Sequence, residues 1–166
     1  MKTDKFNYNL PEHLIAQYPA EKRTDSRLLV AIESIQHEIF KDIGNYFNKG
    51  DLLILNKTSV IPARLYGEKI TGGKIELLLE RFLSDFQTLT QIRSSRAPKE
   101  GAELVFMFQG KRFMATVKGR QDNFFILDWT DDPKSLFEQY GQIPLPPYMN
   151  RAAEKLDEER YETIYA

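Results

Sequence analysis

The sequence predicts a mixed fold, in which a region of short helices and strands leads into a small, strand-rich β domain. Two observations support this prediction. Through residues 63–130, short apolar runs recur at nearly even intervals, and some are separated by two residues that include glycine, which is the spacing of a β-hairpin. Before that region, apolar runs lie between residues that start or end helices, such as Pro11 and Gly50. At 166 residues, the chain is long enough to bury a core without disulfides.

Residues 1–62 are expected to form the first part of a mixed α/β domain. The predicted elements are a short helix from Pro11 to Pro19, strands at 28–32 and 35–40, and a short helix from Asp42 to Gly50. Residues 51–56 read Asp-Leu-Leu-Ile-Leu-Asn, a near-continuous apolar run between polar residues. Such a run is typical of a strand that is buried on both faces.

Residues 63–142 are predicted to form a β domain of their own. Six apolar runs are candidate strands, at 63–70, 74–83, 87–93, 103–108, 112–118 and 123–129. In the fifth run, Phe113, Ala115 and Val117 occupy every second position, as they do on a strand with one buried face. Because closure removes exposed strand edges, six short strands favour a closed barrel or a sandwich. A helix is expected to follow from Pro133 to Gly141.

Residues 143–166 are expected to return to the first domain. Residues 143–148 contain three prolines, too many for a regular element. The acidic stretch at 154–160 is predicted to be helical.

Several enzyme classes lack their motifs here. The sequence has no cysteine, which excludes disulfides, thiolate zinc sites and iron–sulfur clusters. Neither of the two histidines, His13 and His37, is expected to bind a metal. The glycines before Lys74 resemble a P-loop, but Ile75 stands where Ser or Thr would hold magnesium. No G-x-G-x-x-G or G-x-S-x-G motif occurs. With no signal peptide and no long apolar run, a cytoplasmic location is expected.

Charge is distributed unevenly along the chain. The net charge is −1, but residues 64–120 hold 11 Lys and Arg against 6 Asp and Glu, whereas residues 121–166 hold 4 against 10. Because exposed charges are screened beyond a Debye length of about 8 Å, a local surplus matters more to a polyanion than the average of the chain. The basic middle region is compatible with a nucleic-acid contact or with an ordinary solvated surface.

Seven strings in order along the chain carry a family resemblance. They are FNYNLPEHLIAQ (residues 6–17), SRLL (26–29), GDLLILN (50–56), VIPARL (60–65), TGGKIE (71–76), PLPPY (144–148) and RYETIY (160–165). In this order and spacing they resemble S-adenosylmethionine:tRNA ribosyltransferase-isomerases of bacterial queuosine synthesis.

The resemblance implies a reaction and its reactants. Such enzymes transfer the ribosyl part of S-adenosylmethionine to the aminomethyl group of a deazaguanine at the wobble position of tRNA. The sugar rearranges to an epoxycyclopentane, which gives epoxyqueuosine, and adenine and methionine leave. The resemblance therefore implies S-adenosylmethionine as a consumed substrate, tRNA as the partner, and no metal.

The resemblance also implies a fold, an α/β domain interrupted by a small antiparallel β-barrel domain. The family's chains are longer than this one, and their glycine-, alanine- and proline-rich motif ending in histidine would follow Ala166. We therefore expect this chain to be the N-terminal portion of the pattern. Members usually have arginine where this chain has Ser59. The contact with an anion or with the backbone that the resemblance implies for that arginine is therefore not expected here. Lys57, two residues earlier, would point to the other face of a continued strand.

Candidate substrate-binding residues lie within or beside these strings. They are Arg27, Asn56, Thr58, Arg64, Lys74, Glu76, Pro147 and Tyr148. The arginines can bind a carboxylate or phosphate with two hydrogen bonds, and Tyr148 with its prolines can stack on adenine or a flipped base. Each also has a structural interpretation: turn capping for Asn56 and Thr58, ion pairs for the charged residues, and core packing for the prolines and Tyr148.

Candidate tRNA contacts cluster in one polar loop. They are Arg93, Ser95, Arg96 and Lys99, which could bind phosphates or form a solvated loop. The sequence assigns no catalytic base. Two alternatives to the enzyme stay open, a non-catalytic tRNA-binding β-barrel module and an inactive fragment of the enzyme.

Overall fold

The computed structural model describes residues 2–149 and 151–162. The chain divides into two compact units, which are described one at a time. The first takes in residues 2–57 with 146–149 and 151, and the second takes in 58–145 and 152–162.

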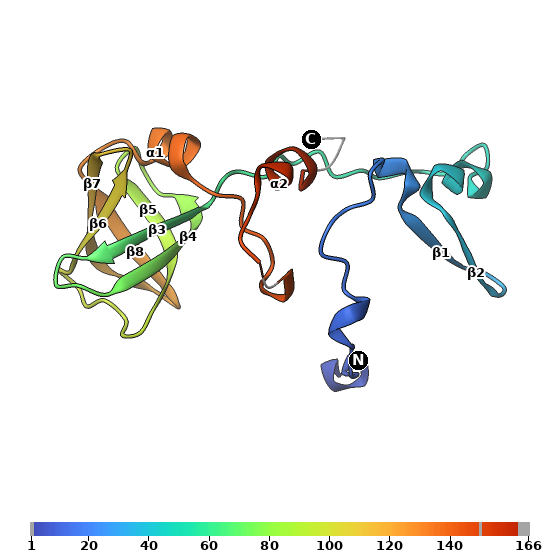
Figure 1. Ribbon diagram of the computed structural model, residues 1–166, viewed down its shortest axis with the longest axis horizontal. Coiled ribbons are helices and arrows are strands. Elements are labelled where there is room, and N and C mark those ends of the chain that lie inside the picture. Colours follow the sequence, from blue (N-terminus) through green and yellow to red (C-terminus); the bar gives the residue numbers. More distant parts are fainter. Residues whose placement is uncertain (1, 150, 163–166) are drawn as a thin grey trace. The chain divides into compact units, whose positions relative to one another are not determined.

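The first unit is built around a β-hairpin. Strand β1 (Arg27–Ala31) pairs antiparallel with β2 (Ile35–Ile39) (Figure 1). Short 3₁₀ helices flank it at Thr3–Phe6, Glu12–Leu14, Arg23–Asp25 and Phe40–Tyr46. Val30 is the one buried hydrophobic side chain among the described residues of this unit. The two predicted strands are thus present, whereas the helix expected from Pro11 to Pro19 is only the turn Glu12–Leu14. Its apolar face has nothing to pack on, since Leu14 is 61% exposed, and short helices without packing are marginal.

The strand predicted at 51–56 is absent, which corrects the sequence analysis. Residues 51–59 are all exposed and form no regular element, with Leu52 and Ile54 more than four-fifths exposed. A strand buried on both faces needs neighbouring strands and covering layers. Within the described residues no strand pairs with this run, so the run has no partner with which it could form a strand.

The second unit contains a closed antiparallel barrel of six strands in the order β3-β4-β5-β8-β7-β6 (Figure 1). The strands are β3 (Arg64–Lys69), β4 (Lys74–Phe82), β5 (Gln87–Ser94), β6 (Glu103–Phe108), β7 (Lys111–Gln121) and β8 (Phe124–Trp129). Each agrees with a predicted strand to within a few residues, so the prediction of a closed β domain is confirmed. The β3–β4 turn uses Gly72 and Gly73 at positive φ, which glycine adopts without steric cost.

Alternate side chains of the strands fill the barrel. Leu65, Leu77, Leu104, Phe106 and Leu127 are at most 1% exposed and belong to one core cluster. Two threonines of β5 are also fully buried. Thr88 accepts a hydrogen bond of 2.8 Å from the indole nitrogen of Trp129, so the polar atoms inside this part of the barrel are paired, as burial requires.

Helix α1 (Pro133–Tyr140) packs on this core through Leu136 and Phe137. Asp132 caps its first turn by accepting from the backbone N–H groups of Lys134 and Ser135 and from the Ser135 hydroxyl. The Ser135 hydroxyl, followed by the Lys134 N–H, lowers the pKa of Asp132. The helix begins at Pro133 and ends before Gly141, as predicted.

The barrel segment starts and ends at one point. Arg64 and Gln142 exchange two backbone hydrogen bonds, of 3.1 Å and 2.8 Å. Beyond them Ile143 and Leu145 are buried. The chain therefore leaves the barrel beside the residue at which it entered.

The remaining elements are a 3₁₀ turn at Pro147–Met149 and helix α2 (Lys155–Arg160). The turn corrects the expectation that residues 143–148 hold no regular element, while α2 agrees with the predicted helix. With two short α-helices and eight strands among the described residues, the chain is mostly β. Its described helices are all too short to cross a membrane.

Candidate functional site

Two of the predicted substrate-binding residues contact each other. Arg64 at the start of β3 places its Nε 2.9 Å from Oε1 of Glu76 on β4. Its Nη2 also donates to the Leu145 carbonyl at 3.2 Å. Both side chains are largely buried, at 17% and 28% exposed, so Arg64 holds the exiting segment against the barrel. Their ion pair joins β3, β4 and the chain beyond α1.

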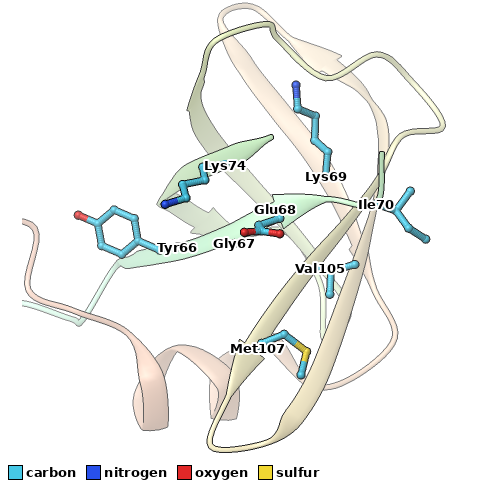
Figure 2. A pocket seen from close by; sticks show the side chains of 8 residues that line it. All are labelled: Tyr66, Gly67, Glu68, Lys69, Ile70, Lys74, Val105 and Met107. Atoms are coloured by element: carbon cyan, nitrogen blue, oxygen red, sulfur yellow. The ribbon is translucent and has the colours of Figure 1, made fainter. Parts of the chain in front are cut away.

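A groove lies on the outer surface of the barrel, where β3 and β6 separate. These strands pair only at Glu68↔Val105 and Lys69↔Leu104, and the groove occupies about 640 Å³. Its lining comprises Tyr66, Gly67, Glu68, Lys69, Ile70, Lys74, Val105 and Met107, drawn in Figure 2. The predicted residue Lys74 is one of them and is exposed.

Ser95, Arg96 and Lys99, three of the predicted tRNA-binding residues, lie in the loop after β5, whereas Arg93 lies on β5 itself, which corrects its expected place in the loop. This loop is tied to the wall of the groove. Lys69 donates through Nζ to the Arg96 carbonyl at 2.8 Å. The Ser94 hydroxyl donates to the same carbonyl at 2.7 Å. The side chains of Arg93, Ser95, Arg96 and Lys99 are all exposed. The loop is therefore fixed at its backbone, while its cationic groups face solvent.

Arg93 lies beside the Arg64–Glu76 pair. The strand register places Glu76 opposite Tyr66 on one side and Arg93 on the other. Cross-strand partners lie close enough to interact. The outer face of β3, β4 and β5 thus carries alternating aromatic, acidic and basic groups.

The other predicted residues lie elsewhere in the chain. Arg27, Asn56 and Tyr148 belong to the first unit and are exposed. Thr58 is exposed and begins the second unit. The side chain of Pro147 lies outside the described residues. The structure therefore gathers Arg64, Glu76 and Lys74 with the basic loop on the barrel, and it describes Arg27, Asn56 and Tyr148 in a separate body.

A further contact in the first unit was not predicted. Arg151 lies 4.6 Å from the centre of the Tyr18 ring and donates through Nε to the Gln17 carbonyl at 3.1 Å. A guanidinium at this distance from an aromatic face forms a cation–π interaction. It joins the proline-rich segment near Tyr148 to the segment that contains Tyr18.

Tyr66, Lys69 and Met107 were also missed by the sequence analysis. Tyr66 could have been found, because it alternates with buried Leu65 in β3 and must point outward. Met107 and Lys69 could not, because their proximity depends on how β3 and β6 pair. In the described part of the chain, no three His, Asp or Glu side chains gather as metal ligands would.

The fold and surface define this chain as a protein with a closed antiparallel β-barrel, whose outer groove is lined by one tyrosine, two lysines and a glutamate among apolar residues. Residues 3–166 match the family model described as Queuosine biosynthesis protein. The chain belongs to this family, which confirms the resemblance seen in its motifs.

Two curated relatives share the name S-adenosylmethionine:tRNA ribosyltransferase-isomerase. The S-adenosylmethionine:tRNA ribosyltransferase-isomerase of Legionella pneumophila (strain Lens) is 45% identical over 169 residues, which cover 100% of this chain and 49% of the relative. The protein of that name from Acinetobacter baumannii is 44% identical, covering 99% of this chain and 48% of the relative. A crystal structure of S-adenosylmethionine tRNA ribosyltransferase from Thermotoga maritima is 38% identical, with a TM-score of 0.42, over 82% of this chain and 48% of the other. The chain thus spans about half the length of the curated relatives it matches.

Proposed function

We propose that this protein acts in queuosine synthesis as an S-adenosylmethionine-dependent tRNA ribosyltransferase-isomerase. It transfers the ribosyl group of S-adenosylmethionine to the aminomethyl-deazaguanine wobble base of tRNA and isomerises it to give epoxyqueuosine, with release of adenine and methionine. The observation that carries this proposal is the family match over residues 3–166. The names of relatives about 45% identical support it. A reaction on tRNA places the protein in the cytoplasm.

The division of labour between residues is part of the same proposal. The exposed cations Arg93, Arg96 and Lys99, with Ser95, contact tRNA phosphates. The substrate contacts are Arg27, Asn56, Thr58, Lys74, Pro147 and Tyr148, together with the Arg64–Glu76 pair. The pair's burial and its bond to Leu145 support a positioning role at the start of β3. Exposure of the loop cations supports their availability to a polyanion.

The proposal includes a domain arrangement. An α/β domain formed by residues 1–62 and 143–166 is interrupted by the barrel domain at 63–142. The paired backbones of Arg64 and Gln142 support an insertion, because both connections to the host domain leave from one place.

The test is adenine release from S-adenosylmethionine, measured by mass spectrometry. The full reading frame and the chain 1–166 are each mixed with S-adenosylmethionine and tRNA that carries the aminomethyl-deazaguanine base. The matched control is the same tRNA with unmodified guanine at the wobble position. We expect the full reading frame to release adenine only with the modified tRNA. Adenine release without tRNA, or none from the full reading frame, would contradict the proposal.

A second candidate is a tRNA-binding module without chemistry of its own. It is favoured by one observation, that the folded barrel and its basic loop lie in a chain that spans about half of its relatives. It predicts tRNA affinity that falls steeply with salt and no adenine release from residues 1–166. Release by these residues alone would exclude it.

A further inference from the structure

We infer that the groove between β3 and β6 binds an unpaired nucleotide of the tRNA anticodon loop, with the base against Tyr66 and the phosphate at Lys74. This inference rests on the proposed function for its partner. It goes beyond the proposed function because it assigns a binding site to Tyr66 and Met107, neither of which is among the candidate site residues predicted from the sequence.

The groove is an opening in the seam of the barrel. Arg64 is bridged to Gln142 and Glu68 is paired with Val105, so among the described residues no strand pairs with the edge of β3 between them. Gly67 lies in this interval, and a Cβ there would lie 2.6 Å both from the Val105 carbonyl oxygen and from the side chain of Phe106. Glycine therefore allows β6 and the buried Phe106 ring to lie close against β3 in this interval. The volume of about 640 Å³ falls within the roughly 300–1,000 Å³ of ordinary ligand sites.

The lining combines an aromatic ring with cations. Tyr66 is 48% exposed, and Met107 on the opposite wall is 58% exposed. Lys74 lies on β4 opposite Glu68, two residues from the register partner of Tyr66, and its side chain extends toward Tyr66 (Figure 2). An exposed ring offers a stacking surface to any base, and a neighbouring lysine offers a charge to its phosphate. Glu68 adds an acceptor, which can bind the amino or imino hydrogens of a base edge.

The groove is continuous with the basic loop. Lys69, which lines the groove, donates to the Arg96 carbonyl. The loop that carries Arg96 and Lys99, which follows Arg93 on β5, is therefore tied to the strand that carries Tyr66. A strand whose phosphates follow these cations would bring a base to the groove. Paired RNA would not, because its bases are stacked on one another and its helix is recognised through backbone and shape.

The test compares an RNA hairpin containing the anticodon loop with a fully paired duplex of the same stem sequence. Binding to the chain 1–166 is measured by fluorescence anisotropy across a salt series. We expect Tyr66→Ala to weaken hairpin binding about 5- to 150-fold, the range for loss of one base stack, and Tyr66→Phe to retain it. We expect Lys74→Ala to reduce the slope of log affinity against log salt by about 0.7 to 0.9.

The matched control is Phe86→Ala. Phe86 is 50% exposed, close to the value for Tyr66, and lies at the opposite end of β4 in the turn before β5. We expect this variant to bind the hairpin as the unaltered chain does. Equal losses for Phe86→Ala and Tyr66→Ala, or no loss for Tyr66→Ala, would overturn the inference.

A second measurement follows the unaltered chain and uses one conservative variant only to assign a signal. The chain has four methionines, so ¹³C-methyl labelling gives few signals, and Met107→Leu assigns the one in the groove. We expect the hairpin to shift the Met107 signal, and a Met107 signal unmoved at saturating hairpin would overturn the inference. These outcomes are separable from the adenine assay. If adenine is released but the affinity for the hairpin does not depend on Tyr66, only the groove site is rejected. If hairpin binding depends on Tyr66 but the full reading frame releases no adenine, only the enzymatic reaction is rejected.

Discussion

Gln109 adopts a backbone conformation that its side chain disfavours. It has φ of 49° and is followed by Gly110 with φ of 79°, in the two-residue turn between β6 and β7. Positive φ at both positions is the type I′ turn, for which Asn-Gly is preferred. We expect Gln109→Asn to raise the free energy of unfolding by about 0.5 kcal/mol, measured by urea denaturation. Gln91→Asn, on an exposed strand position, serves as the control and should give no gain. A gain at both positions would remove the turn as the cause.

Asp132 makes the start of α1 sensitive to pH. Its pKa is lowered by the Ser135 hydroxyl and the Lys134 N–H, so its carboxylate stabilises the folded chain above the ordinary pKa of about 3.9. This contribution is lost as the pH falls through the lower pKa of the folded state. We therefore expect Asp132→Ala to lower Tm at pH 7 and to lower it less as the pH falls below about 4.

Asp132→Asn separates the cap from its charge. Asparagine keeps one acceptor oxygen with which it can cap the first turn, but it does not titrate. Its Tm should lie close to that of the unaltered chain at pH 7, and the difference between them should change little in acid compared with Asp132→Ala. A difference between Asp132→Ala and the unaltered chain that is independent of pH would show that the carboxylate does not carry the effect.

Arg64 and Glu76 show how far single residues could be interpreted from sequence. Both were singled out by their motifs, and an ion pair was one of the two interpretations given for each. That they pair with each other, and that Arg64 also reaches Leu145, depends on the β3–β4 register and on the path of the chain after α1. Neither is encoded in the residues adjacent to them.

At the scale of elements, β5 and β8 are joined inside the barrel by a polar contact. Trp129 donates to Thr88, which is fully buried. We expect Thr88→Val to lower the free energy of unfolding by about 1–3 kcal/mol, because the indole N–H loses its acceptor without gaining water. Thr88→Ser keeps the hydroxyl and should cost less than Thr88→Val in the same urea titration. A valine variant as stable as the serine variant would show that the hydrogen bond contributes little.

The strands of the barrel could be predicted because each carries its own signal. Alternating apolar residues and glycine turns are local, and the closure of six short strands buries them together. The run at 51–56 carries an equally strong apolar signal, yet it forms no strand, because a strand is completed only by neighbours in the sheet. The groove was unpredictable for a related reason, since it exists where two strands distant in sequence stop pairing.

At the scale of the molecule, the apolar run at residues 51–56 exposes a continuous apolar surface. Leu52, Leu53, Ile54 and Leu55 are 85%, 57%, 83% and 47% exposed, and such contiguous patches bind other apolar surfaces. We expect the double variant Leu52→Ser/Ile54→Ser to reduce the fluorescence of the apolar dye ANS bound by the chain 1–166, with no change in the Tm of the barrel.

The control is Ile32→Ser/Ile35→Ser. These two side chains are 73% and 71% exposed but lie at the turn between β1 and β2, interrupted by Glu33 and Ser34. We expect this variant to bind ANS nearly as the unaltered chain does. Equal reductions in both variants would mean that the dye follows total apolar exposure rather than the continuous run.

The backbone bridge between Arg64 and Gln142 bears on how such a protein can change in evolution. A segment whose two ends meet can be deleted, enlarged or exchanged for another of unrelated sequence, and the gap left behind is short enough for a few residues to close. The barrel and its groove can thus diverge as a unit while the rest of the chain stays constant.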